Sequence, residues 1–114
     1  MMGKIYIKAW LDEIHFAISS EKVRQILSAP VTIPVPDAPE GICGLVFTDG
    51  EVLPLRTLNP ERGSPARLVI LCSGGQAYAA TDIDTMGMLG EKERETADTF
   101  GDTDILLLGK EGTA

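Results

Sequence analysis

Positive charge is scarce in this 114-residue chain, which has 10 Lys and Arg against 17 Asp and Glu and a formal net charge of −7. At most two basic residues fall within any five consecutive positions. Nucleic-acid binding requires a basic patch that neutralises phosphates, so this class of function is excluded. The anionic inner surface of a membrane would also repel the chain.

Cysteine and histidine, the usual residues of thiol and metal chemistry, are equally scarce. Cys43 and Cys72 lie far apart, form no Cys-x-x-Cys motif and have apolar neighbours, so we expect two buried thiols rather than a redox or zinc site. His15 is the only histidine and is predicted to lie, partly exposed, on a strand. One alternative remains open: a small β-barrel enzyme or ligand-binding module whose pocket uses Cys43 and His15.

Long apolar runs are also absent. No run approaches the roughly 20 residues that cross a bilayer, and the N-terminal segment lacks the apolar stretch and cleavage site of a secretory signal. We therefore expect a cytoplasmic protein without membrane insertion. The acidic residues lack the regular spacing of a calcium loop and Gly74-Gly75 is not followed by lysine, so neither a metal nor a cofactor is predicted.

What is present is the pattern of a single, mainly β domain. An apolar share of 44% and a charged share of 24% are ordinary for globular proteins, and this length suits one domain. Residues 5–9 and 14–18 alternate apolar with other side chains, which predicts an antiparallel hairpin that turns at Asp12-Glu13. Further strands are predicted over 67–72, 76–80, 83–89 and 105–108, while 91–98 is polar on every face and is expected to be an exposed turn or loop.

Between these strands lies the most distinctive part of the sequence, residues 20–58. Val23, Ile26 and Leu27 recur at helical spacing behind a capping Ser20, which predicts one short helix that Pro30 closes. A proline-paced extended segment follows. Asp49-Gly50 then favours a type I′ turn, which would pair Phe47 with Val52 and Val46 with Leu53.

This order of elements resembles the CheW-like family of bacterial chemotaxis. The residues that carry the resemblance are the hairpin and helix HFAISSEKVRQIL, the Pro36-x-x-Pro39 segment, and the Gly-rich hairpin from Gly44 to Leu58 with its Pro54. The resemblance implies two small SH3-like β-barrel subdomains packed through a shared apolar core. We place their halves at roughly 14–58 and 66–108, with the N-terminal strand added to them.

The resemblance also implies a function. Members of this family are non-catalytic adaptors that couple the regulatory domain of a CheA-like histidine kinase, itself of the same fold, to the cytoplasmic tip of a chemoreceptor. They use no cofactor. Carried over to this sequence, the partner-binding positions are Val23, Gln25, Thr48 and Asp49.

Some positions depart from the family pattern. Phe47 and Asp49 stand where the family has Asn and Arg, and Thr57 stands where it has Asp. Asp49 reverses the charge of an arginine that contributes to partner binding in the family, and residues 91–104 replace a longer second half. We therefore expect a divergent, shortened member whose partner differs from the usual one.

Overall fold

The structure is a computed structural model, and it describes residues 5–88, 98–100 and 102–110. The described residues form strands connected by turns and loops, and none of them forms a helix. The strands are β1 (Ile5–Leu11), β2 (Ile14–Ser19), β3 (Val23–Ser28), β4 (Val31–Ile33), β5 (Ile42–Thr48), β6 (Glu51–Arg56), β7 (Leu68–Cys72), β8 (Gln76–Ala80), β9 (Asp82–Met88), β10 (Asp98–Phe100) and β11 (Asp102–Lys110). The mainly β class is confirmed.

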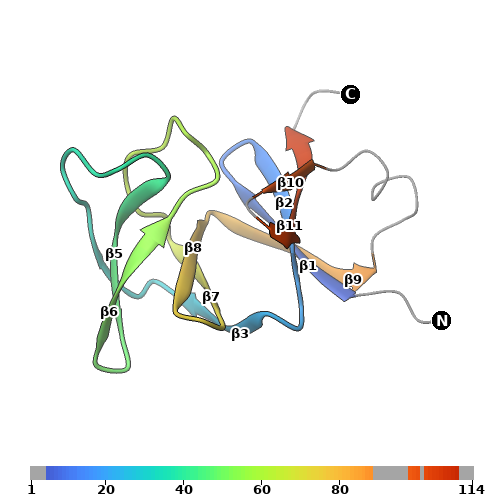
Figure 1. The fold of residues 1–114 in the computed structure, drawn as a ribbon, viewed down its shortest axis with the longest axis horizontal. Helices are drawn as coiled ribbons and strands as arrows, with labels where there is room; N and C mark the ends of the chain where they lie inside the picture. The colour runs from blue at the N-terminus through green and yellow to red at the C-terminus, as the bar shows by residue number, and fades with distance from the viewer. Residues whose placement is uncertain (1–4, 89–97, 101, 111–114) are drawn as a thin grey trace.

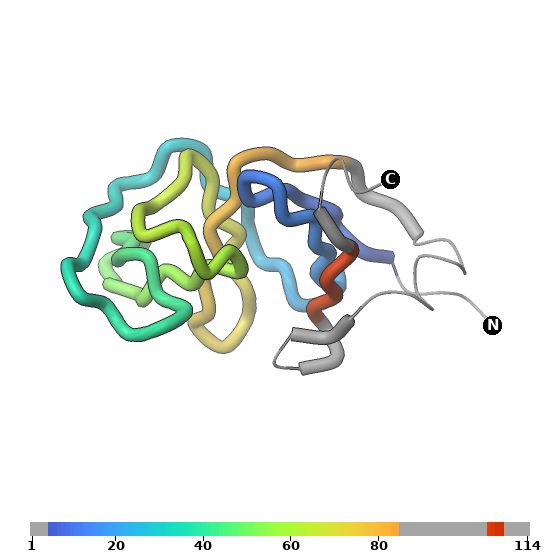
Figure 2. The backbone as a smooth tube through the Cα atoms, turned by 90° about the horizontal axis from the view of Figure 1, so that it is seen from above, coloured from blue at the N-terminus to red at the C-terminus, as the bar shows by residue number. Residues whose placement is uncertain are grey.

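Two sheets make up the molecule (Figure 1). The five-stranded sheet has the order β10-β11-β2-β1-β9, and the six-stranded sheet has the order β3-β7-β8-β6-β5-β4. The six-stranded sheet is built from one continuous stretch of chain, whereas both ends of the chain build the other; Figure 2 shows the two lobes from above. Strands from both predicted halves, 14–58 and 66–108, therefore occur in each sheet.

One apolar core joins the two sheets. Phe16 and Ile18 of β2 and Ile105 of β11 belong to the same buried cluster as Val46 of β5 and Val69 of β7. Ala9, Val46 and Leu55 alternate along their strands with less buried side chains, whereas β7 is buried along its whole length. The shared core expected from the resemblance is thus present.

The predicted hairpins have the expected registers. Ile7 pairs with Ile18 across the first hairpin, and the second pairs Phe47 with Val52 and Val46 with Leu53. Asp49 and Gly50 have φ angles of 50° and 75°, which are the left-handed values that a type I′ turn requires. The tight turn at Gly74-Gly75, between the antiparallel strands β7 and β8, is also confirmed, with φ angles of 83° and 75°.

The predicted helix at Val23–Leu27 is wrong, because this segment is the edge strand β3. A bulge between Val23 and Gln25 inserts one residue, so Val23 pairs with Cys72 and Ile26 pairs with Ile70. Val23, Ile26 and Leu27 recur at helical spacing in the sequence, but in the strand Val23 and Leu27 pack against the core while Ile26 is exposed. A segment of about eight residues is too short for a stable helix, whereas pairing with the buried strand β7 satisfies its backbone.

Two other expectations concern the segment between β9 and β11 and the membrane. The prediction for 91–98 lies almost entirely outside the described residues, as does most of the segment expected to replace the family's longer second half. Among the residues that the structure does describe, no helix has the length and apolar character needed to cross a bilayer.

Candidate protein-binding surface

The four residues expected to bind a partner lie in two separate places. Val23, half-buried, and Gln25, exposed, are on β3 at one edge of the six-stranded sheet. Thr48 and Asp49 are at the turn between β5 and β6. Because β7, β8 and β6 lie between β3 and β5, hydrogen-bonded pairing does not bring the two pairs together.

A larger apolar surface, which the sequence analysis did not identify, covers the opposite end of this sheet. It consists of two rows across β4, β5 and β6, which we call the open face: Val31, Phe47 and Val52 in one row, and Ile33, Leu45 and Pro54 in the next. The exposed fractions are 67% for Val31, 53% for Val52, 44% for Ile33 and 37% for Phe47. In Figure 1, β5 and β6 lie at the end of the molecule away from β1 and β9.

The open face is not needed by the core of the domain. Val46 and Leu55, on the same strands but pointing to the other side, are fully buried in the core cluster. An antiparallel sheet with one solvated face normally carries polar side chains on that face. The strand β5 therefore carries apolar side chains on both faces, of which the core of the domain covers one, and this two-sided pattern was the signal available in the sequence.

Unpaired charges of opposite sign mark the two ends of the open face. Asp49 lies at the hairpin turn, next to the Phe47–Val52 row. Arg56 lies at the other end of β6, two residues beyond Pro54 and exposed on the same side. Neither side chain forms an ion pair or hydrogen bond with another described residue, so each keeps its charge for an external group.

The edge of the sheet beside the open face is poorly suited to strand addition. The edge strand β4 has only three residues and is flanked by Pro30 and Pro34. Proline lacks the N–H that a new strand would need, and short, proline-bounded strands are a common way of protecting a sheet edge. The side chains of the face are therefore more accessible to another molecule than the backbone of the edge.

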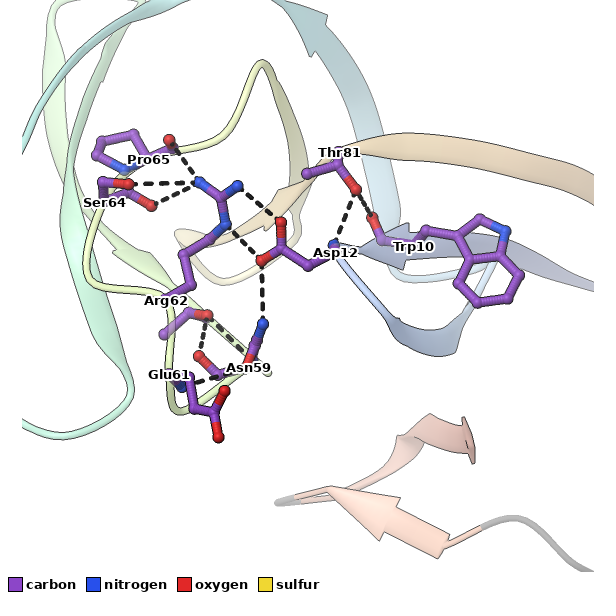
Figure 3. Close-up of polar contacts among 9 residues, drawn as sticks. Trp10, Asp12, Asn59, Glu61, Arg62, Ser64, Pro65 and Thr81 are labelled. Atoms are coloured by element: carbon purple, nitrogen blue, oxygen red, sulfur yellow. Dashed lines mark hydrogen bonds and ion pairs between the residues drawn. The ribbon is translucent and has the colours of Figure 1, made fainter. Parts of the chain in front are cut away.

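A polar clamp connects the two sheets (Figure 3). The guanidinium of Arg62 donates two hydrogen bonds to the carboxylate of Asp12. Nε donates to Oδ2 at 2.7 Å, and Nη2 donates to Oδ1 at 2.8 Å. Asp12 lies in the β1–β2 turn, and Arg62 lies in the loop that follows β6. The same arginine also donates to the carbonyl oxygen of Pro65 at 3.0 Å, so it braces its own loop while reaching across to the other sheet.

The clamp is supported by neighbouring polar groups. Asn59 Nδ2 donates to Asp12 Oδ2 at 3.0 Å, and the backbone N–H of Asp12 donates to Thr81 Oγ1. The bidentate hydrogen bond to Arg62 lowers the pKa of Asp12, and the same hydrogen bond raises the pKa of Arg62. Thr57, at the position where the family has Asp, is buried and exchanges hydrogen bonds with the backbone of Asn59, so its role is to shape this loop.

A small cavity lies between the sheets on another side of the molecule. Its volume is about 150 Å³. The residues that line it come from both sheets and from the turns beside them: Ile18, Lys22, Cys72, Ser73, Gln76, Tyr78 and Ile105. The cavity lies at the junction of the two sheets and is large enough for a side chain to enter.

Cys43 and His15 do not form a reactive pair. Cys43 is 1% exposed within the core, and burial raises the pKa of its thiol, which disfavours the nucleophilic thiolate. His15 stacks on Trp10 with ring centroids 4.0 Å apart, and its Nε2 lies 3.0 Å from Asp84 Oδ2. No hydrogen bond joins Cys43 to His15, and within the described part of the chain no three His, Cys, Asp or Glu residues are grouped for a metal ion.

Comparison with known proteins identifies the architecture. No family model matches the chain, and no curated protein matches it either. Among solved structures, it is similar to the scaffolding protein TtCheW from Thermoanaerobacter tengcongensis, with a TM-score of 0.63 and 16% sequence identity over 86% of this chain and 71% of that one. At this level of identity the likeness establishes the fold, and the chain has a CheW-like fold.

Proposed function

We propose that this protein is a non-catalytic adaptor of the chemotaxis type, which couples a CheA-like histidine kinase to chemoreceptors in the cytoplasm. The observation that carries the proposal is the open face: an apolar surface on a CheW-like fold that the domain's own core does not use. The fold alone does not determine a function, so the proposal depends on this surface and on the absence of a reactive site among the described residues.

The kinase regulatory domain is the proposed occupant of the open face. An apolar centre with charges at its border is typical of protein–protein interfaces. Asp49 lies at that border and would repel a carboxylate on a partner, since like charges brought together cost several kcal/mol when desolvated. The regulatory domain that binds this chain should therefore present a basic or neutral residue opposite Asp49.

The other predicted contacts are assigned to the receptor side. Val23 and Gln25 on β3 follow the turn that contains Lys22, and Lys22 lines the cavity between the sheets. A receptor tip that inserts a side chain at this cavity would also meet β3. We propose this junction as the receptor-binding groove.

Calorimetry with the regulatory domain of the kinase and with receptor tips of the same organism tests the proposal. Wild-type protein should bind the regulatory domain, and Asp49→Arg should weaken that binding while strengthening binding to a standard regulatory domain that carries an acidic residue. Glu21→Arg changes the net charge equally at an exposed turn away from the open face and serves as the control. If neither the wild type nor the variants bind any kinase domain or receptor tip, the proposed function is wrong.

The alternative function, an enzyme or ligand-binding module using Cys43 and His15, is tested by thiol titration of the native protein. Because both cysteines are buried, they should react with a thiol reagent only after unfolding. A native Cys43 that reacts quickly near neutral pH would support the alternative and contradict the adaptor.

A further inference from the structure

The open face has a charge pattern that suits a second copy of the same chain. Along β6 the sequence runs from the Asp49 turn through Val52 and Pro54 to Arg56. The face thus has a carboxylate at one end, apolar side chains in the middle and a guanidinium at the other. Two such faces packed with their strands antiparallel place Asp49 of each copy opposite Arg56 of the other.

We propose that two copies of this chain associate through their open faces. A twofold axis that runs across the strands, between the two faces, generates this arrangement and makes both charge contacts at once. Packing the two faces with their strands parallel would instead bring the two Asp49 carboxylates together, on a chain that already carries a net charge of −7. The charges therefore select the antiparallel orientation.

The area of the face sets the strength of this dimer. The exposed side chains of Val31, Ile33, Phe47 and Val52 form a patch on the order of a few hundred Å². A stable dimer buries about 800 Å² on each partner, so the open face supports a weak, reversible association. Strand addition at the edge is disfavoured because Pro30 and Pro34 bound the short strand β4, so the contact is face to face.

The dimer would affect the proposed function, although it does not require that function to be correct. If the kinase regulatory domain also binds the open face, self-association and kinase binding exclude each other. A high concentration of free protein would then be held as dimers, and the kinase domain would convert dimers to mixed complexes.

Sedimentation of the full purified chain, from about 10 µM to about 1 mM, is the first test. Wild-type protein should shift from monomer toward dimer over this range. Val52→Thr, which keeps the β-branched shape but adds a hydroxyl, should weaken the dimer, while Ile5→Thr at an exposed apolar site on β1 should not. A wild type that stays monomeric at every concentration overturns the proposal.

A charge-swap pair tests the orientation. Arg56→Glu leaves carboxylates at both ends of the face and Asp49→Arg leaves cations at both ends, so each variant alone should dimerise about tenfold more weakly or worse. An equimolar mixture should restore the wild-type level, because the two variants complement each other at both contacts. Arg24→Glu and Glu21→Arg, exposed charges outside the open face, are the matched controls, and thermal melts confirm that every variant is folded.

The results separate this proposal from the adaptor function. Dimers that are unaffected by Arg56→Glu and Asp49→Arg, or variants whose mixture stays monomeric, overturn the proposed interface. Titration with the kinase regulatory domain is interpreted separately. If the chain binds the kinase domain but is always monomeric, only the self-association proposal is wrong. If it dimerises but does not bind the kinase domain, only the adaptor proposal is wrong.

Discussion

Individual residues control the local geometry of the hairpin that carries the open face. Gly50 has a φ of 75°, and a Cβ placed there would meet no atom within 4 Å, so the requirement for glycine is conformational and not steric. Gly44 is different, since a Cβ would lie 2.5 Å from the carbonyl oxygen of Ile33. This close approach holds β4 against β5 and could not be deduced from a glycine in a sequence.

We predict that Gly50→Val destabilises the protein by roughly 1–3 kcal/mol, because a β-branched residue is strained at positive φ. Gly50→Asn should have a much smaller effect, since asparagine tolerates the left-handed region. Chemical denaturation of the two variants measures the difference. Equal stabilities would argue against the positive-φ turn.

Two phenylalanines provide a matched comparison between the core and the open face. Phe16 is fully buried in the shared core, so Phe16→Ala should cost about 3–5 kcal/mol. Phe47 is 37% exposed on the open face, and Phe47→Ala should cost less than half as much. A Phe16→Ala loss below about 1 kcal/mol would mean that Phe16 is not a core residue.

At the scale of elements, the sequence predicted the strands that alternate regularly and failed where the alternation is interrupted. The hairpin at 5–18, the Asp49-Gly50 turn and the strand pair around Gly74-Gly75 were all predictable from local patterns. The edge strand β3 was predicted as a helix because its apolar residues recur at helical spacing, and its pairing with β7 is not a property of the segment itself. The clamp between Asp12 and Arg62 was not predictable, because it joins residues 50 positions apart.

The clamp predicts a specific pH dependence of stability. Because Arg62 lowers the pKa of Asp12 in the folded state, the clamp stabilises the protein fully above the unfolded pKa of about 3.9 and loses this contribution as the pH falls through the folded value. Arg62→Gln should therefore lower the thermal stability at neutral pH and flatten its decline below about pH 4.

Melting temperatures between pH 2 and pH 7 measure this effect, with Arg24→Gln as the control because Arg24 is an exposed arginine on β3. Parallel pH profiles for the wild type and Arg62→Gln would show that Asp12 is not titrating against Arg62 in the folded protein.

At the scale of the whole molecule, the resemblance in residues 20–58 led correctly to a CheW-like fold with two β subdomains and one shared core. Which strands belong to which sheet was harder to predict, because strands from the two ends of the chain combine in the five-stranded sheet. The open face was predictable only in part: the pairing of Phe47 with Val52 follows from the turn, whereas the place of β4 beside β5 required the structure. The assignment of Val23, Gln25, Thr48 and Asp49 to partner binding remains a prediction.

The most direct test of the adaptor proposal is to map where the kinase regulatory domain touches this chain. Isotope-labelled protein should be titrated with the regulatory domain from the same organism while backbone amide NMR signals are followed. We predict that the largest changes fall on β4, β5 and β6 and on the Asp49 turn, with little change on β1 and β9. Absence of binding, or changes confined to the five-stranded sheet, would contradict the account.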